Sequence, residues 1–253
     1  QVPHRGTTAR LPGDYGVGLT DTSTVYTGTS FDTPRQHALA GANVVVFTRR
    51  APYKESPNED ASALIATADG AFVLAVADGL GGLPAGAAAA ALAVNVLAER
   101  VGNARTHKLR EPILDSIEQA NRAILALGNG AATTLAVVEI RGSIARTYHI
   151  GDAGVLITGQ RGGRRLQTLA HSPTGYAQEA GLLEEADALN HDERNIVSNV
   201  LGSHELRIEI GPLRRLAPRD TVIIASDGLF DNLLNDEIVE YARRGALKQA
   251  ADA

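Results

Sequence analysis

The chain contains no cysteine, no methionine and no tryptophan among its 253 residues. The absence of cysteine excludes disulfide bonds, metal sites built on thiolates and a cysteine nucleophile. Positive charge is not in excess either, because 29 acidic residues outnumber 24 basic ones and give a net charge of −5. We therefore expect no nucleic-acid partner, since a broadly basic surface is missing. One local basic cluster remains, formed by Arg161, Arg164 and Arg165.

Long apolar runs are also missing. No run reaches the roughly 18 to 20 residues that a helix needs to cross a bilayer. The longest candidate, residues 85–98, is rich in alanine, contains Asn95 and is followed by charged residues, which is typical of a buried helix. Residues 1–14 carry basic residues and turn formers in place of an apolar signal core. We therefore expect no membrane partner and no export signal, and a cytoplasmic location fits this composition best.

The composition is that of an ordinary globular protein, and the sequence contains segments typical of strands and segments typical of helices. Short apolar runs predict strands at 43–48, 62–68, 71–77, 133–140, 144–150, 155–158, 206–210 and 221–225. Apolar residues at three- and four-residue steps predict a helix at 110–127, while a proline at the start and a glycine just after the end predict another at 84–101. A last amphipathic helix is predicted to begin at Asn235 and to run to the end of the chain at Ala253. Residues 1–40 are polar and turn-rich, and we interpret them as a leader or irregular edge segment. Helices grouped between runs of strands indicate an α+β layered fold, with a single domain over residues 41–253.

Acidic residues stand at the edges of several predicted strands, namely Asp78, Asp152, Asp227 and the neighbouring Glu59 and Asp60. A carboxylate at such a place is costly to bury unless a positive group compensates it. Hard divalent cations prefer oxygen ligands, so the spacing favours a metal site built from Asp78, Asp227 and either Glu59 or Asp60. The alternative is that each Asp-Gly pair is only a turn, which is the more common situation for one such pair taken alone.

The ordered set of motifs resembles the metal-dependent Ser/Thr protein phosphatases of the type 2C class, in their bacterial form. The motifs are Asn58-Glu59-Asp60, Ala77-Asp78-Gly79-Leu80-Gly81-Gly82, Ala132-Thr133-Thr134-Leu135, Gly151-Asp152 and Ser226-Asp227-Gly228-Leu229-Phe230-Asp231. The segment from Leu169 to Gly202 also resembles the part that these enzymes carry before their second Ser-Asp-Gly strand. Together these matches cover about residues 43–245.

The resemblance implies a sandwich of two antiparallel β-sheets flanked by helices, in α-β-β-α layers, with two Mn²⁺ or Mg²⁺ ions at one end. By motif, Asp78 bridges the two ions, Gly79 offers its backbone carbonyl to one ion and Asp227 binds the other. Glu59 and Asp60 hold metal-bound waters. Asp152 matches a ligand of a weaker third ion in some members, and a turn-capping role is the alternative for it.

The reaction that the resemblance implies is hydrolysis of phosphoserine and phosphothreonine in proteins, with Asp78 and Asp227 as the catalytic residues. Two cations lower the pKa of a shared water and neutralise charge on the phosphoryl oxygens, so no covalent enzyme intermediate is needed. The expected partner is thus a phosphorylated protein, while the sequence leaves the oligomeric state open.

The chain departs from the family pattern at several places. Many members have an arginine that grips the substrate phosphate where this chain has Glu55; Lys54 is the candidate replacement, and a solvated loop lysine is an equal alternative. Gly154 stands where members usually have an arginine. The family's C-terminal strand and the Asp ligand before it do not appear in this sequence, so either the sequence is truncated or one of the ions loses a ligand. These departures favour the alternative of a catalytically weak regulatory or scaffold domain on the same fold. A phosphatase of small phosphate esters is not separable by sequence.

Leu80 stands where some relatives have a histidine proposed as general acid. His149 and His191 are the remaining candidates, but we interpret His149 as a packed structural residue and His191 as a solvated or capping one. Residues 168–204 are polar and helix-prone with few apolar stripes, so we expect a mobile flap that contributes to substrate choice.

Overall fold

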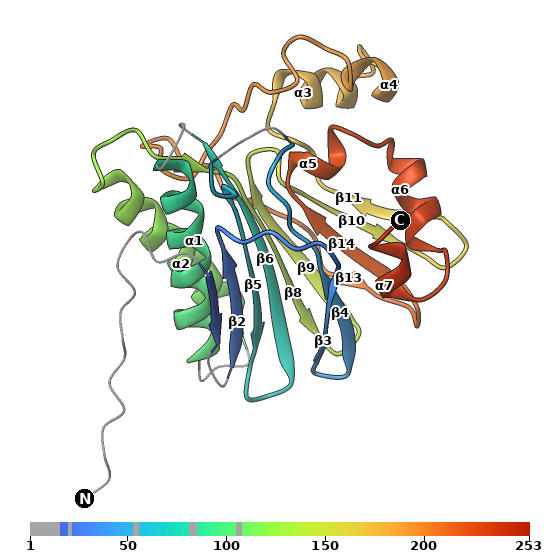
Figure 1. Ribbon diagram of the computed structural model, residues 1–253, viewed down its shortest axis with the longest axis horizontal. Helices are drawn as coiled ribbons and strands as arrows, with labels where there is room; N and C mark the ends of the chain where they lie inside the picture. The colour runs from blue at the N-terminus through green and yellow to red at the C-terminus, as the bar shows by residue number, and fades with distance from the viewer. Residues whose placement is uncertain (1–15, 20–21, 53–55, 81–84, 105–107) are drawn as a thin grey trace, which may run out of the picture.

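A large antiparallel β-sheet forms the centre of the molecule. The computed structural model describes residues 16–19, 22–52, 56–80, 85–104 and 108–253 (Figure 1). The sheet has nine strands, with the order β1-β2-β5-β6-β8-β9-β12, while β7 pairs with β6 and β13 pairs with β9. The strands are β1 Gly16–Leu19, β2 Ser23–Thr27, β5 Asp60–Ala66, β6 Ala71–Leu80, β7 Ala132–Thr133, β8 Leu135–Arg141, β9 Ile144–Ile150, β12 Glu209–Ile210 and β13 Arg214–Arg215.

A second layer of strands covers one face of this sheet. It consists of a three-stranded sheet, ordered β11 (Arg164–Gln167), β10 (Gly154–Thr158) and β14 (Thr221–Ala225), and of a hairpin of β3 (Arg35–Leu39) and β4 (Ala42–Val46). Phe72 and Leu74 of β6 pack against Val155 and Ile157 of β10 in the core between the layers. Because side chains alternate along a strand, the intervening residues of β6 point to the opposite face of the large sheet.

Two helices, α1 (Ala85–Gly102) and α2 (Arg110–Leu125), cover that opposite face. The face of α1 that meets the sheet is built from small residues, among them Ala89, Ala90 and Ala93, which are all fully buried. Alanines of β5 and β6 face them, so the helix lies close to the sheet. By length and composition α1 could cross a membrane, but here it packs into the core, which confirms the prediction of a buried helix.

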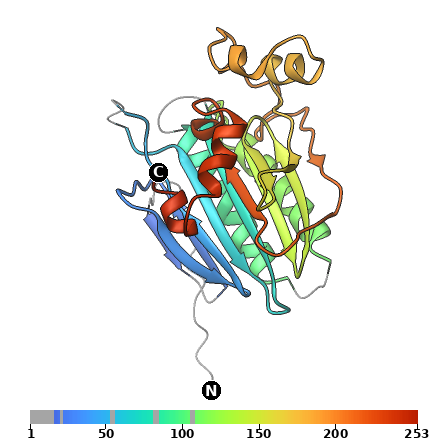
Figure 2. The same cartoon turned by 90° about the vertical axis from the view of Figure 1, so that its right-hand side faces the viewer.

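Helices also cover the outer face of the second layer, which completes the expected α-β-β-α layers. These are α5 (Asp227–Phe230), α6 (Asn235–Ala242) and α7 (Leu247–Ala250), and Ile238 and Val239 of α6 pack on Leu156 and Ile223. Two further short helices, α3 (Pro173–Glu179) and α4 (Glu185–Ala188), stand apart from the sandwich at the top of Figures 1 and 2. The rest of residues 168–204 is mostly turns, so this segment is less helical than its composition suggested.

The prediction of an irregular segment over residues 1–40 is wrong for its described second half. Residues 16–39 contain β1, β2 and β3, and β2 lies between β1 and β5 in the large sheet. Val25 and Tyr26 of β2 are buried. A second correction concerns the last helix, which ends at Ala242; the chain turns at Gly245, with φ of 70°, before α7 begins.

Candidate metal centre

Carboxylates from both layers converge at one end of the sandwich. In the large sheet, Asp60 opens β5 and lies directly opposite Asp78 of β6 in the strand register. Directly opposed residues of antiparallel strands point to the same face, and the pattern of β6 directs Asp78 toward the second layer. From that layer, Asp227 follows β14 and Asp152 precedes β10, which are paired neighbours.

The electrostatics of these side chains show that they share one site. Burial, together with the nearby carboxylates of Asp60 and Asp227, raises the pKa of Asp78 to about 10. Burial and the charge of Asp227 raise the pKa of Asp60 to about 6, although the Ser226 hydroxyl lowers it in part. Burial and Asp227 also raise the pKa of Asp152 to about 7. Asp227 therefore acts on all three of the other carboxyl groups.

Such a group of carboxyls is unfavourable without a cation. In the described part of the chain, no salt bridge joins Asp60, Asp78 or Asp152 to a basic side chain. A divalent ion removes the mutual repulsion, and its preference for oxygen ligands matches a donor set made of carboxylates. The residues present thus fit hard divalent cations, as the spacing of the sequence predicted.

The backbone of Asp78 is fixed by two threonines that precede β8. The carbonyl of Asp78 accepts hydrogen bonds from the Thr134 N–H at 2.9 Å and from the Thr133 hydroxyl at 2.7 Å. The N–H of Asp78 donates to Oγ1 of Thr134 at 3.2 Å. Next to it, a Cβ on Gly79 would lie 2.3 Å from the carbonyl carbon of Gly86 in α1, so the contact leaves no space for a side chain.

The other carboxylate of the large sheet, Asp60, is also held by its neighbours. The amide of Asn58 donates to the Thr29 carbonyl at 2.8 Å and to Oγ1 of Thr48 at 2.6 Å, and its oxygen accepts from the Asp60 N–H at 3.2 Å. Ser226, which precedes Asp227, donates its hydroxyl to Oδ2 of Asp60 at 3.2 Å. This bond links the two layers at the site. Glu59 is half-buried beside Asp60, and its charge contributes to the raised pKa of Asp60.

Asp231 joins this group, although it was not among the predicted site residues. Its N–H donates to the Asp227 carbonyl at 2.7 Å, so the two residues are one helical turn apart. Burial and the charge of Asp227 raise the pKa of Asp231 to about 6. The four-residue spacing after Asp227 was the available sequence signal, because residues at that spacing share a helix face.

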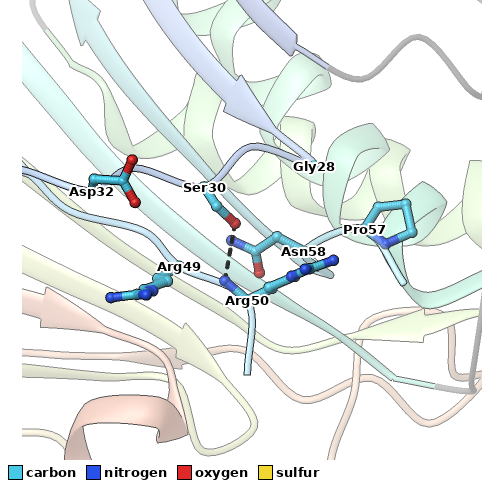
Figure 3. A pocket seen from close by; sticks show the side chains of 7 residues that line it. All are labelled: Gly28, Ser30, Asp32, Arg49, Arg50, Pro57 and Asn58. Carbon is cyan, nitrogen blue, oxygen red and sulfur yellow. Dashed lines mark hydrogen bonds between the residues drawn. The ribbon is translucent and has the colours of Figure 1, made fainter. Parts of the chain in front are cut away.

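A pocket of about 380 Å³ lies beside Asn58, next to the strand that carries Asp60 (Figure 3). Arg49 and Arg50 line it, and the Arg50 N–H donates to Oγ of Ser30 at 3.1 Å. In Figure 3 the two arginine side chains point to opposite sides, with Arg50 running along Asn58. The pocket therefore brings positive charge to this edge of the site. The predicted phosphate-binding Lys54 lies outside the described residues.

His149, His171 and Glu209 form a second group that has the composition of a metal site, with their ligand atoms within 4.8 Å of one another. Hydrogen bonds argue against that role. Nδ1 of His171 accepts from the Gly151 N–H at 3.1 Å and from the amide of Asn199 at 2.9 Å. The proton of His171 must therefore be on Nε2, which donates to Glu209 at 3.1 Å and has no lone pair left for a metal.

This histidine cluster instead supports the turn that carries Asp152. The His171 N–H donates to the Gly151 carbonyl at 2.9 Å, so His171 bonds both polar backbone atoms of Gly151. His149 stacks on His171 and donates from Nε2 to the Leu169 carbonyl at 2.8 Å. Burial lowers the pKa of His149. His149 is thus a packed histidine, as predicted, and His191 is a capping one, since its Nδ1 accepts from the Glu193 N–H at 3.2 Å.

Comparison with known proteins agrees with this geometry. The family profile "Protein phosphatase 2C" matches residues 49–250. A Streptococcus pyogenes protein named as a 2C-type protein phosphatase is 31% identical over 195 residues, which are 74% of this chain and 78% of the relative. The solved serine/threonine phosphatase of S. agalactiae superposes with a TM-score of 0.71 at 26% identity and covers 90% of both chains.

A further solved structure shares the fold at lower identity. It is the catalytic domain of the serine/threonine protein phosphatase PstP in complex with 2 manganese ions, with a TM-score of 0.67 and 21% identity over 91% of this chain and 88% of that one. The profile match covers most of the chain and includes the carboxylates at the end of the sandwich. The chain belongs to the protein phosphatase 2C family.

Proposed function

We propose that the protein is an active phosphatase that hydrolyses phosphoserine and phosphothreonine in proteins with the help of Mn²⁺ or Mg²⁺ ions. The observation that carries this proposal is the convergence of Asp60, Asp78, Asp152 and Asp227 at one end of the sandwich, where burial and the neighbouring carboxylates raise the pKa of Asp78 to about 10. Family membership supports it, as do the phosphatase of S. agalactiae and the manganese complex of PstP.

The positions of the side chains suggest their roles. Asp78 interacts with both Asp60 and Asp227, which suits a ligand shared by two ions. The carbonyl of Gly79 is the proposed ligand of one ion, and Asp227 is the proposed ligand of the other. Glu59 and Asp60 orient water, with Asp60 fixed by Ser226. Asp152 and Asp231, which both feel the charge of Asp227, form the proposed place for a third ion.

When bound, a pair of divalent cations supplies an activated water and neutralises charge on the phosphoryl group. The chain's own residues provide the geometry for this chemistry. Thr133 and Thr134 fix the backbone of Asp78, so its carboxylate needs little reorganisation when it binds. Lys54 remains the proposed grip for the substrate phosphate, and Arg49 and Arg50 add positive charge at the neighbouring edge.

The decisive experiment is Mn²⁺-dependent hydrolysis of p-nitrophenyl phosphate and of a phosphothreonine peptide. We expect Asp78→Asn and Asp227→Asn each to lower kcat by at least about 100-fold, because each removes a ligand of the ions. Asp236→Asn is the matched control, since the side chain of Asp236 is 87% exposed. Circular dichroism verifies that each variant is folded.

Other outcomes separate the alternatives. Activity that persists in both variants, or in excess chelator, contradicts the proposed mechanism. A folded wild-type protein that binds Mn²⁺ without turning over either substrate favours a scaffold role. Rapid turnover of free phosphate esters with none of the phosphopeptide favours a small-molecule phosphatase.

A further inference from the structure

A groove of about 360 Å³ lies between the edges of the two sheets, formed by β11 of the small sheet and β13 of the large one. Its walls carry arginines and leucines, namely Arg165, Arg214, Arg215, Leu166, Leu213 and Leu216. Among the described strands, β11 is the last strand of its sheet, and β13 pairs with β9 alone. Both are therefore edge strands, each with one row of unpaired backbone groups.

The groove has an excess of positive charge on a protein whose net charge is −5. Arg165 is neutralised, because it lies 3.2 Å from the carboxylate of Asp220, whose side chain is 2% exposed. Arg214 and Arg215 are exposed and have no acidic partner among the residues that the structure describes. A basic site on a protein of net negative charge attracts an acidic ligand.

The groove also offers apolar surface. Leu213 is 57% exposed, while Leu166 and Leu216 are half-buried beside the core. Charged residues often protect sheet edges from unwanted pairing, and that simpler role would explain the arginines. Edge protection does not explain why a leucine is exposed next to the arginines. It also does not explain why both charges are positive, because acidic residues protect an edge equally well. A ligand that carries both acidic and apolar side chains matches the whole surface.

The groove lies at the far end of the sandwich from the metal centre. β13 pairs with β9 through Ile144 and Ala145, at the start of β9, whereas Asp152 follows the other end of that strand. Six residue steps of about 3.3 Å separate these ends, which gives about 20 Å. A chain segment bound in the groove could thus belong to the same protein whose phosphorylated residue occupies the active site.

We propose that this groove is a docking site for an acidic, leucine-containing segment of the phosphoprotein substrate. The proposal rests on the proposed phosphatase function, and it adds a reason why one phosphoprotein is preferred over another. Docking raises the local concentration of the phosphorylated residue at the active site, so it lowers KM without a new contact at the metal ions.

The test compares two phosphothreonine peptides, one plain and one extended by a Gly-Ser linker of about ten residues and a tail of alternating Glu and Leu. For the wild-type protein we expect the extended peptide to have a KM about fivefold lower, and Arg214→Glu/Arg215→Glu to remove this difference. Arg110→Glu/Arg122→Glu on α2 is the matched control, because it changes the net charge equally on the opposite face. Neither double variant should alter turnover of p-nitrophenyl phosphate.

A binding assay separates failure of this proposal from failure of the phosphatase function. Fluorescence anisotropy of the labelled Glu-Leu tail reports binding whether or not the protein turns over phosphate, and binding should weaken as salt rises. Loss of binding only in the Arg214/Arg215 variant supports the docking site. Equal binding by both variants, no binding by the wild type, or preferential binding to vesicles of anionic phospholipid overturns it.

Discussion

Asp78 illustrates how single residues define this centre. Its side chain interacts with the carboxyls of Asp60 and Asp227, while hydrogen bonds from Thr133 and Thr134 fix its backbone. Burial and these neighbours raise its pKa to about 10, so in the metal-free protein it is protonated at neutral pH. A bound divalent ion reverses that preference, because ligation requires the carboxylate.

Asp152 and Asp231 form the outer part of the centre, so their loss should weaken ion binding. We expect Asp152→Asn and Asp231→Asn each to raise the Mn²⁺ concentration at half-maximal activity by at least about tenfold. A titration of p-nitrophenyl phosphate hydrolysis with Mn²⁺ measures this. Asp236→Asn should behave like wild type, and an unchanged Mn²⁺ requirement in both site variants would show that they lie outside the centre.

His171 is fully buried and accepts hydrogen bonds from Gly151 and Asn199. His171→Ala leaves both donors unsatisfied, and we expect it to lower the free energy of unfolding by about 3 kcal/mol. His171→Asn offers one acceptor and should lose less. Urea unfolding monitored by circular dichroism gives the values, with the half-buried His191→Ala as control. Similar stabilities of the two alanine variants would argue against the supporting role of His171.

The sequence revealed the residues whose signal is local. Asp60, Asp78, Asp152 and Asp227 each adjoin a strand that has a clear apolar pattern, and they meet because antiparallel strands bring alternate ends together. The role of His171 could not be predicted, because its hydrogen-bond partners Gly151 and Asn199 lie 20 and 28 residues away in the chain. Such bonds depend on the tertiary fold, which spacing along the sequence does not encode.

Among the elements, α1 depends most on small side chains. Ala93 is fully buried in the interface between α1 and the sheet, whereas Asn95, two residues later, is exposed. We expect Ala93→Leu to destabilise the protein by about 1–3 kcal/mol, because a larger side chain overpacks a fully buried position. Asn95→Leu introduces the same residue on the solvent side and should change stability little. Thermal unfolding of the two variants distinguishes them, and equal melting temperatures would contradict tight packing.

Local sequence composition predicts some strands of this protein and misses others. The strands β6 and β8 were predictable because their apolar runs are long and clear. Ser23–Thr27 has the sequence Ser-Thr-Val-Tyr-Thr, whose polar residues resemble a turn-rich region, yet it is a strand between β1 and β5. Its hydrogen bonds to β5 and the burial of Tyr26 stabilise it. Tertiary pairing thus overrides local composition here.

At the scale of the whole molecule, the acidic centre couples stability to pH and to metal. In the metal-free protein, burial and Asp227 raise the pKa of Asp152 from 3.8 to about 7, so the folded state binds a proton that the unfolded state has lost. This contribution to stability is complete below about pH 4 and disappears as the pH rises through 7. We therefore expect the metal-free wild type to lose stability relative to Asp152→Asn between pH 5 and 8.

Differential scanning fluorimetry in chelator measures this effect. The melting temperature of the wild type should fall relative to that of Asp152→Asn by about 4 °C or more over this range. Burial lowers the pKa of His149 from 6.5, so its contribution to stability rises with pH. That contribution is the same in both proteins and cancels from the difference between them. Saturating Mn²⁺ should raise the melting temperature of the wild type more at pH 8 than at pH 5. A difference in melting temperature that stays constant with pH would contradict the raised pKa of Asp152.

The contribution of both layers to the centre has a mechanical consequence. Asp60 and Asp78 belong to the large sheet, whereas Asp152 and Asp227 flank strands of the small one. Ions held by these four carboxylates would link the two sheets at this end of the sandwich. Withdrawal of the ions should therefore increase amide hydrogen exchange first at that end, while the strands beneath α1 stay protected.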